Sequence, residues 1–414
     1  MTDVSIDTAR DWDHSDVLRH FRERFALPAK VVYLDGNSLG ALPRDTALRV
    51  SRVVNQEWGG DLIRGWTVHD WYNAALTVGA KVAKLVGAAD DEVIVTDSTS
   101  VNLFRLIFAA LQMQPQKSEI LCEAGDFPTD LYVCQGASAA YGRGRTFKMV
   151  PRDRLLASID DNTALVLLSH VHYRTSEIYD MHAVTEAAHR AGALVLWDLS
   201  HSTGAIPVAL NRAGADFAVG CGYKYLNGGP GAPAYLYVAQ RHHSRAANSI
   251  SGWLGHARPF DFVDNYEPAA GIRRFLSGSC SIIACRALEV GVDLMLEAGI
   301  DRVREKSRRL SEFFIQLVES ECSGYGLKLV SPRHADCRGS QVSFSHPRGF
   351  QIMQALISEF VIGDFRAPDV MRFGFTPLYT RFEDVFTAVA RLRTILDDER
   401  WKDPVYAVRG GVVT

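Results

Sequence analysis

Two short apolar runs lie between residues 193 and 231 of this chain, and each leads into a side chain that can carry chemistry. The first run, residues 194–197, ends at Asp198, and the second, residues 217–221, is followed by Lys224. Short branched and aromatic runs of this kind are typical of buried strands. If the two strands are parallel neighbours, both side chains lie at the carboxyl edge of an open sheet, where such sheets bind ligands.

The rest of the chain places this stretch within a larger sheet. Between residues 61 and 280, strand-like runs alternate with segments of helical periodicity, which is typical of a parallel sheet covered by helices on both faces. Residues 281–414 mix long helices with short alternating runs. We therefore predict an α/β protein with a large, mostly parallel domain over residues 61–280 and a smaller α+β domain over residues 281–414. Residues 1–60 are assigned to the small domain or to a dimer interface.

Helices are also predicted ahead of the large sheet. Apolar residues at helical spacing over residues 16–27 indicate an amphipathic helix near the start of the chain. Pro43 is placed to open a helix after a turn-rich loop. A further helix is predicted from Asp70, which can act as its N-cap, to about Leu85.

Asp198 and Lys224 form the pair of groups that pyridoxal phosphate requires. A lysine amine bonds to the aldehyde of the cofactor, and a carboxylate opposite the ring nitrogen keeps that nitrogen protonated. At about 4 Å and an effective dielectric near 20, such a charge pair interacts by roughly 4 kcal/mol, which is enough to hold a pyridinium at neutral pH. The alternative is a buried ion pair between the two side chains. The glycine-rich segment at residues 228–231 allows close backbone approach and favours the cofactor.

Composition limits the classes of partner. The 414 residues carry a formal net charge of −3 and no basic run, so neither nucleic acid nor an anionic membrane is expected to bind. No segment approaches the ~20 apolar residues of a membrane span, and no apolar leader is visible. The seven cysteines include no C-x-x-C pair and are typical of reduced thiols, and no metal-ligand spacing is visible. These features predict a cytoplasmic protein.

Six segments spread along the chain match one family. They are WDLSHSTG and GYKYLNGGPGAPAYLYV around the aspartate and the lysine, and YLDGNSLGALP, DFPTD, SGWLGH and FTPLY elsewhere. In type and order they resemble segments of kynureninase, a fold-type-I pyridoxal phosphate enzyme related to aminotransferase class V. The resemblance covers nearly the whole chain. It implies a fold-type-I large domain, pyridoxal 5'-phosphate as cofactor, and a homodimer with the active site at the subunit interface.

The same resemblance implies which side chains hold the cofactor. Lys224 would bond to it, and Asp198 would face the ring nitrogen. Asp130 would add a second carboxylate on the pyridine side, and Tyr223 with the nearby His201 would contact the phosphate and relay protons. The remaining expected contacts are the ring-stacking Phe127 together with Thr99, Ser100, Pro128, Thr129, Ser169, Trp253 and Ser279.

Some of these positions also have a purely structural interpretation. Thr99 and Ser100 precede a helix predicted to begin near Val101, and a helix N-terminus both binds phosphate and needs an N-cap. Thr129 or Asp130 can likewise cap the helix that follows Pro128. The two roles are compatible at each of these positions.

Three residues are expected on the substrate side. Arg372 lies between apolar neighbours ahead of a proline turn, and an arginine in such a setting forms either an interior ion pair or a bidentate carboxylate site. In the family that this chain resembles, the matching arginine binds the α-carboxylate of the substrate. Asn37 and Ser38 lie in a loop whose family counterpart is near the active site. Arg174 is left unassigned.

The function implied by the resemblance is hydrolysis of L-kynurenine, and of its 3-hydroxy derivative, to an anthranilate and L-alanine in tryptophan catabolism. A related cysteine desulfurase is one alternative, but the segment VIGDFRAPDVMR, where such enzymes carry a nucleophilic cysteine, has none. A dinucleotide-binding oxidoreductase is disfavoured because no G-x-G-x-x-G motif follows the first strand. A non-catalytic cofactor-binding protein would not require Asp198, Lys224 and Arg372 together.

Overall fold

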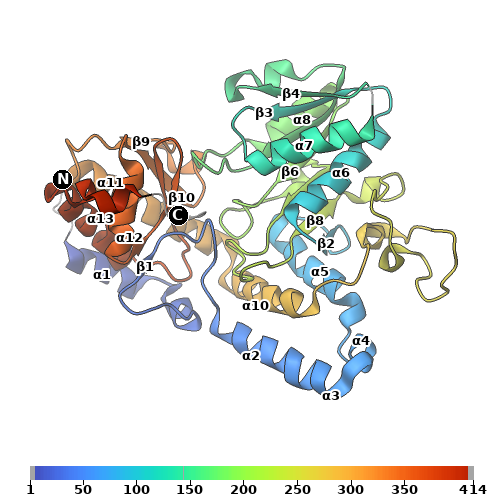
Figure 1. Ribbon diagram of the computed structural model, residues 1–414, viewed down its shortest axis with the longest axis horizontal. Coiled ribbons are helices and arrows are strands. Elements are labelled where there is room, and N and C mark those ends of the chain that lie inside the picture. Colours follow the sequence, from blue (N-terminus) through green and yellow to red (C-terminus); the bar gives the residue numbers. More distant parts are fainter. Residues whose placement is uncertain (1–4, 143, 409–414) are drawn as a thin grey trace.

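The larger of the sheets forms the centre of the molecule. The structure is a computed structural model that describes residues 5–142 and 144–408. Within these residues the central sheet has the strand order β2-β8-β7-β6-β5-β3-β4, with helices on both faces (Figure 1). Its strands are β2 (Val93–Val95), β3 (Glu119–Glu123), β4 (Thr146–Val150), β5 (Thr163–Ser169), β6 (Leu194–Asp198), β7 (Phe217–Gly220) and β8 (Tyr235–Val238).

The pairing of the central strands brings the two predicted chemical groups to one edge. Strands β5, β6 and β7 are parallel neighbours, with Ser169 opposite Asp198 and Asp198 opposite Val219. Strand β8 alone runs antiparallel to its neighbours β7 and β2. The prediction of a mostly parallel sheet is therefore confirmed. The strands before Asp198 and Lys224 are parallel neighbours, which is the condition under which both side chains lie at one sheet edge.

Helices cover the two faces of this sheet with separate apolar cores. One core joins the sheet to α6 (Thr99–Met113) and α7 (Pro128–Tyr141). The other joins the opposite face to α5 (Ala74–Val86), α8 (Met181–Arg190) and α10 (Ile282–Ala298). The short helices of this half are α3 (Gly59–Asp61), α4 (Gly65–Val68) and α9 (Leu210–Ala213), and α2 (Arg44–Arg52) extends outward from the body (Figure 1).

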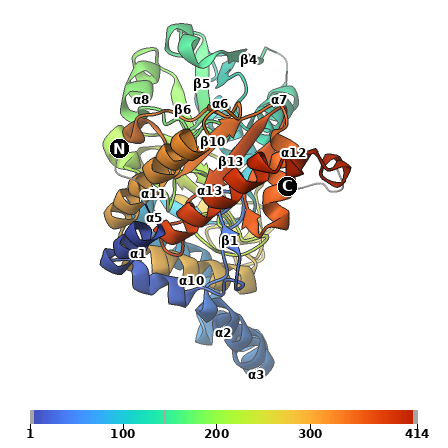
Figure 2. The ribbon, with the colours of Figure 1, turned by 90° about the vertical axis from the view of Figure 1, so that its left-hand side faces the viewer.

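A smaller domain packs against the central one and has a core of its own. Its four-stranded sheet has the order β12-β13-β10-β9, and a parallel pair β1-β11 lies beside it. Helices α11, α12 and α13 lie on its outer side (Figure 2). The bounds are α1 (Ile6–Ser15), β1 (Val32–Tyr33), α11 (Ile300–Glu321), β9 (Lys328–Leu329), β10 (Gln341–Ser345), α12 (Gly349–Ser358), β11 (Val361–Ile362), β12 (Asp364–Arg366), β13 (Val370–Gly374) and α13 (Phe382–Asp397).

This small-domain core combines both ends of the chain. Ala9, Val32 and Leu34 pack in the same cluster as residues from α11 onward, whereas α10 belongs to a core of the central sheet. The predicted domain boundaries at residues 60 and 280 remain predictions.

The predicted helix over residues 16–27 is wrong. The first helix is α1, and the later segment contains a 3₁₀ turn at Arg19–Arg24. The apolar spacing still marked the buried side chains, because Phe21 and Phe25 are in the core. Helix α1 escaped detection because it buries only Ala9 and is otherwise polar.

Asp70 does not cap the α5 helix as predicted. It lies in the left-handed region, at φ 50°, and its side chain makes no capping hydrogen bond to the backbone. A 3₁₀ turn, Trp71–Asn73, separates it from α5, which begins at Ala74. The Asp70 carboxylate instead accepts a hydrogen bond from the Asn73 side chain at 2.7 Å.

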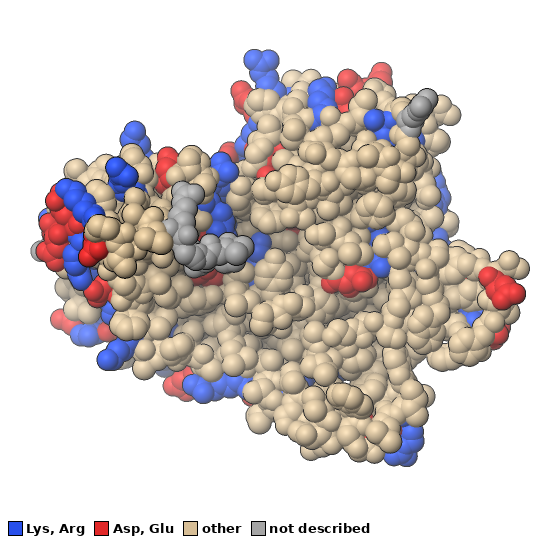
Figure 3. Space-filling model, in the orientation of Figure 1, with Lys and Arg blue, Asp and Glu red and all other residues tan. Residues whose placement is uncertain are grey.

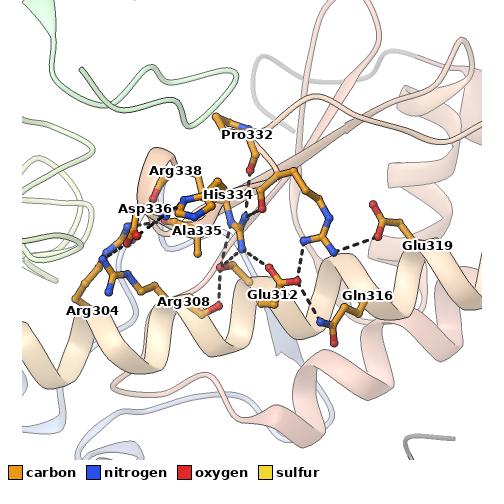
Figure 4. Close-up of polar contacts among 12 residues, drawn as sticks. Arg304, Arg308, Glu312, Gln316, Glu319, Pro332, His334, Ala335, Asp336 and Arg338 are labelled. Atoms are coloured by element: carbon orange, nitrogen blue, oxygen red, sulfur yellow. Dashed lines mark hydrogen bonds and ion pairs between the residues drawn. The ribbon is translucent and has the colours of Figure 1, made fainter. Parts of the chain in front are cut away.

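A polar network on α11 holds the loop between β9 and β10, and this loop contacts the large domain. Figure 4 shows Arg304, Arg308 and Glu312 on α11, and the loop that ends at Arg338. The Arg338 guanidinium is fully buried and donates to the carbonyls of Pro332 and Arg333 and to Glu312. The same loop accepts a hydrogen bond from Ile178 of the large domain at Cys337 O, at 2.9 Å. The large-domain segment around Ile178 is thereby tied to the small domain.

The surface contains a broad weakly charged face. Figure 3 shows few charged side chains over α3 and the adjoining end of α2, whereas the neighbouring loop of residues 250–266 carries charged side chains at its outer end. Across the described ranges, no helix is both long enough and apolar enough to cross a membrane. The large exposed apolar side chains in this region are Trp58, Leu62, Ile63, Val68, Trp253, Phe260, Phe262, Val263 and Tyr266.

Candidate active site

Lys224 lies in the turn after β7, in a buried aromatic setting. Its side chain is 8% exposed, and its Nζ is 2.9 Å from Nε2 of His201. The same Nζ lies 5.6 Å from the ring centre of Phe127 and 5.9 Å from that of Tyr223. The structure therefore brings four of the predicted cofactor residues around one amine.

Burial keeps the neighbouring imidazole neutral. The pKa of His201 is lowered well below its ordinary value, first by burial and then by the charges of Lys224 and Arg372. A neutral Nε2 accepts the hydrogen bond of the lysine ammonium. His201 can therefore hold the Lys224 amine in place without bringing a second positive charge beside it.

Two carboxylates share the space on the pyridine side of the predicted site. Asp198, the last residue of β6, accepts the Ser200 N–H at 2.7 Å. Asp130, in the first turn of α7, is buried, and neither of its oxygens has a hydrogen-bond donor within the described chain. Burial raises the pKa of both carboxyls, and the Asp198 charge raises that of Asp130 further. Asp198 thus has the Ser200 N–H and the Lys224 charge nearby, whereas Asp130 has no donor among the described residues.

The N-terminus of α6 forms the predicted phosphate end of the site. Ser98 is its N-cap and accepts the Val101 N–H at 3.3 Å. Thr99 and Ser100 form the first turn, and both are half-buried. Because Ser98 does the capping, the hydroxyls of Thr99 and Ser100 are available to a ligand, and the dipole of this fifteen-residue helix favours an anion.

Asp126 holds the cofactor loop together, and the sequence analysis missed it. Its carboxylate accepts the Phe127 N–H at 2.7 Å and the Ser169 N–H at 2.9 Å. It thereby joins the loop that carries Phe127, Pro128 and Thr129 to the end of β5. The sequence holds a signal for the first contact only, since an aspartate before a turn commonly accepts a following N–H.

Arg372 lies in β13 with every nitrogen of its guanidinium engaged. Nε donates to Asp364 Oδ1 at 2.6 Å, and a terminal nitrogen bonds the second oxygen of the same carboxylate. The other terminal nitrogen donates to the Tyr173 carbonyl at 2.7 Å, and Ser38 Oγ accepts a further bond at 3.1 Å. The interior ion pair, one of the two alternatives for this residue, is thus present. The charge of Arg372 also lowers the pKa of His201, so the arginine lies near the lysine site.

The predicted substrate loop meets this arginine. Ser38 Oγ also donates to Asp364 at 2.7 Å. Asn37 is fully buried, and neither its amide nitrogen nor its oxygen has a hydrogen-bond partner in the described part of the chain. A buried amide without partners is costly and marks a place where a ligand or water would bond.

Two predicted cofactor residues lie on the surface. Trp253 is 39% exposed and packs on Trp66 and Phe260, with ring centres 6.3 and 6.0 Å away. Ser279 is exposed. Within one chain neither contacts Lys224 by any bond recorded for the described residues, so their cofactor roles remain predictions. Arg174 stacks near Tyr173, with its guanidinium carbon 5.6 Å from the ring centre.

These features fit pyridoxal phosphate. A helix N-terminus suits its phosphate, Phe127 its ring and Lys224 its aldehyde, and the buried carboxyls of Asp198 and Asp130 suit its ring N–H. Together with the mostly parallel sheet and the small second domain, they define a fold-type-I pyridoxal phosphate enzyme. Solved structures agree on the fold: a cysteine desulfurase from Thermococcus onnurineus NA1 gives a TM-score of 0.78 at 17% identity, covering 92% of this chain and 98% of the other. The cysteine desulfurase CsdA from Escherichia coli gives 0.76 at 18% identity, covering 92% and 98%.

The particular family follows from sequence comparison. Residues 303–392 match the family model of the kynureninase C-terminal domain. A kynureninase from Burkholderia mallei (strain SAVP1) is 50% identical over 406 residues, and the kynureninase from Pseudomonas fluorescens is 45% identical over 405 residues, each match covering 97% of both chains. This chain belongs to the kynureninase family.

Proposed function

We propose that this protein hydrolyses the Cβ–Cγ bond of L-kynurenine to give anthranilate and L-alanine, with pyridoxal 5'-phosphate as its cofactor. The full-length match to kynureninases supports this reaction. The observation that carries it is the buried arrangement of Lys224 and His201 beside Asp198 and Asp130. When bound, the cofactor draws electrons from the substrate Cα into its ring.

Lys224 is the proposed base at the substrate Cα. Its amine would hold the aldehyde of the cofactor in the resting enzyme and, once free, would take the proton from the substrate Cα. His201 Nε2, 2.9 Å away, orients the free amine. Tyr223 keeps its proton, because burial raises the pKa of its phenol, so it donates a hydrogen bond to the phosphate or passes a proton to the substrate.

Asp198 and Asp130 are proposed to hold a proton at the ring nitrogen. Two carboxylates whose pKa values are raised by burial gain most from a shared cation, because the cation removes the penalty of their burial. Thr99 and Ser100 would hold the phosphate and Phe127 would stack on the ring. Pro128 and Thr129 shape the same loop, and Ser169 lies beside it at the end of β5.

The substrate α-carboxylate is proposed to bind at Arg372, with Ser38 and Asn37 beside it. Ser38 already bonds both Arg372 and Asp364, and the buried Asn37 amide has free donors and an acceptor. The same pocket is proposed to accept 3-hydroxykynurenine, which differs by one ring hydroxyl.

We further propose a homodimer with the active site at the interface. Support comes from exposed apolar side chains in residues 58–68 and in the loop of residues 250–266, where Ile63 is 77% exposed and Phe262 80% exposed. A monomer rarely exposes contiguous apolar patches of this kind. Trp253 lies in this loop, from which it would reach the partner's cofactor. A cytoplasmic location is proposed because all seven cysteines are free thiols.

The deciding experiment is product analysis. Purified protein with pyridoxal phosphate is mixed with kynurenine and, separately, with 3-hydroxykynurenine. Anthranilate or its 3-hydroxy derivative should appear in equal amount to L-alanine. Absence of both aromatic products would refute the proposed reaction.

A cysteine desulfurase activity is the alternative that the same experiment should include. Cys337 is the one exposed thiol among the described cysteines, and its carbonyl holds Ile178 on the outer side of the domain junction. The corresponding loop after β12 offers Arg366, Ala367 and Pro368 instead of a cysteine. Cysteine should therefore release no sulfide, and Cys337→Ala should keep full kynurenine hydrolysis. Sulfide release that disappears in this variant would favour the desulfurase.

A further inference from the structure

Two acidic residues meet beside the proposed carboxylate site. Strand β1 pairs with β11 in parallel register, with Val32 opposite Val361 and Tyr33 opposite Ile362. Asp35 follows β1 by two residues, as Asp364 follows β11, and the two carboxyls are close enough to interact electrostatically. The backbone of Asp35 also bridges to Gly374, two residues after Arg372 in β13.

The two carboxylates differ in what surrounds them. Asp364 is fully buried and receives the guanidinium of Arg372, that of Arg366 at 2.8 Å and the Ser38 hydroxyl at 2.7 Å. Asp35 is 5% exposed, and its Oδ1 has no hydrogen-bond donor within the described chain. Arg366 and Arg372 therefore both pair with Asp364, and Asp35 has no direct ion pair among the described residues.

Burial and the neighbouring acid make a charge on Asp35 unfavourable. They raise the pKa of its carboxyl to about 7, with burial as the larger cause, Asp364 next, and the Ser38 hydroxyl and the two arginines acting in the opposite direction. The ionisable groups that face Asp35 from the surrounding elements are Asp364, Arg366, Arg372, Tyr33, Tyr225 and Tyr379.

Charge balance then sets a condition on substrate binding. Two arginines match two ionised acids, so the cluster is neutral when Asp35 is ionised and carries one positive charge when Asp35 is protonated. A substrate α-carboxylate adds a third negative charge at Arg372. Only the protonated state of Asp35 leaves the occupied cluster neutral, and a buried site strongly disfavours an unmatched charge.

We propose that Asp35 takes up one proton when the substrate carboxylate binds beside Arg372, so that Asp35 acts as a positioning residue for carboxylate recognition. This inference rests on the proposed function, because it takes kynurenine's α-carboxylate to be the group bound there. It predicts that affinity for the carboxylate falls as pH rises, because ionised Asp35 must first be protonated.

The test uses the holoenzyme and 4-(2-aminophenyl)-4-oxobutanoate, which is kynurenine without its α-amino group. This ligand presents the carboxylate but cannot displace Lys224. Calorimetric titration in buffers of different ionisation enthalpy counts the protons taken up at pH 6.5, 7.5 and 8.5, while cofactor absorbance shows any proton gained at the cofactor itself. Above about pH 7 the wild-type affinity should weaken by a factor approaching ten per pH unit, with proton uptake rising towards one.

Asp35→Asn separates this role from a merely structural one. Its neutral amide resembles the protonated acid, so the variant should take up no proton and should bind about thirtyfold more tightly than wild type at pH 8.5. A misfolded variant cannot gain affinity. The control is Asp13→Asn, which changes another carboxyl whose pKa burial raises, at the N-terminus of α13, and which should keep the wild-type pH dependence.

The outcomes are distinct. A wild-type protein that binds the ligand without proton uptake, or does not bind it at all, overturns the proton coupling whether or not the variant folds. Equal pH dependence in Asp35→Asn and wild type overturns the assignment to Asp35. Proton uptake at Asp35 without anthranilate formation from kynurenine would refute only the proposed reaction.

Discussion

Buried aspartates lie at both ends of the central strands, and the two ends differ in how many hydrogen-bond donors they supply to the carboxylates. At the amino end of β7, Asp216 accepts four hydrogen bonds, from the Val195 N–H at 2.8 Å, His189 at 2.9 Å, and His242 and Arg241 at 2.7 Å each. At the carboxyl end of β6, Asp198 accepts the Ser200 N–H, and its neighbour Asp130 has no donor within the described chain.

The two ends therefore have opposite proton affinities. Burial alone would raise the pKa of Asp216, but hydrogen bonds from His189 and His242 hold it below its ordinary value. At Asp198 and Asp130 burial dominates, and both pKa values are raised. A buried acid whose donors belong to the fold stabilises the fold, whereas a buried acid without donors is prepared for a ligand.

Removing the amine at the carboxyl edge should give the largest effect on activity. Lys224→Ala should lower kynurenine turnover about 10⁴-fold or more, because the proposed base is gone. Borohydride treatment of wild-type holoenzyme should fix the cofactor on the peptide that contains Lys224. The control is Lys306→Ala, which removes another buried lysine, one paired with Asp16 at 2.6 Å, and which should leave the labelling unchanged. Labelling on a different lysine would show that the cofactor is not bound at the carboxyl edge of the sheet, and the comparison would fail.

Asp216→Asn should test the amino edge through stability. Loss of a buried charge that serves two histidines and an arginine typically costs about 3 to 5 kcal/mol of unfolding free energy. Because the folded pKa of Asp216 is lowered, its stabilisation is present above the unfolded pKa near 4 and lost as pH falls through the folded pKa. Denaturant unfolding at pH 7 should therefore show the loss, while turnover per folded molecule stays normal. A loss of turnover alone would contradict the distinction between the two ends.

Arg372→Ala should weaken binding of kynurenine and of L-alanine together, by about 2 to 5 kcal/mol, because both present the same α-carboxylate. The matched control is Arg338→Ala. Arg338 is equally buried but bonded to loop carbonyls and Glu312, so its loss should lower stability and spare affinity. Unchanged affinity for both amino acids in Arg372→Ala would show that Arg372 serves only in its ion pair with Asp364.

Asp198→Asn should keep the cofactor and lose about a hundredfold or more in turnover, since a neutral amide does not hold the ring nitrogen protonated. Its unfolding free energy should change less than that of Asp216→Asn, because the Asp198 carboxylate has fewer donors to lose. The absorbance spectrum checks cofactor retention and stopped assays check the rate. Near-normal turnover would show that the ring nitrogen is protonated by another group.

Much of this contrast could be predicted from the sequence, because strand ends are local features. Apolar runs that end at Asp198 and before Lys224 sufficed to indicate two strands, and the pairing of β6 with β7 shows that these strands are parallel neighbours. The helix over residues 16–27 was wrong because apolar spacing reports burial and does not distinguish an α-helix from the 3₁₀ turn at Arg19–Arg24.

The partners of the site residues could not be predicted, because they depend on strand pairing and loop packing that the sequence pattern does not specify. Asp364 reaches Arg372 through an antiparallel pairing of β12 with β13, and Asp126 reaches Ser169 across 43 residues. Neither contact leaves a periodic pattern in the sequence. The surface positions of Trp253 and Ser279 likewise depend on what a second chain would place there.

The smallest predicted effect is a gain in stability on replacing Asp130, and it tests the contrast between the two ends of the sheet most directly. Asp130 is buried without donors, so its raised pKa means that the folded apoprotein must keep a proton on it or hold an unmatched charge. A group with a raised folded pKa lowers stability as pH rises above its unfolded pKa. In Asp130→Asn the amide can donate to the neighbouring Asp198 without needing a proton.

Asp130→Asn should therefore raise the unfolding free energy of the apoprotein by about 1 kcal/mol at pH 8, the order of one unsatisfied buried group. The gain should vanish below about pH 3, where the acid is protonated in both the folded and the unfolded state. Bound cofactor should reduce the gain, because the ring N–H then supplies the donor that Asp130 lacks. Apoprotein that is less stable at pH 8 after this substitution would show that Asp130 is supported like Asp216, and the distinction between the two ends of the sheet would fail.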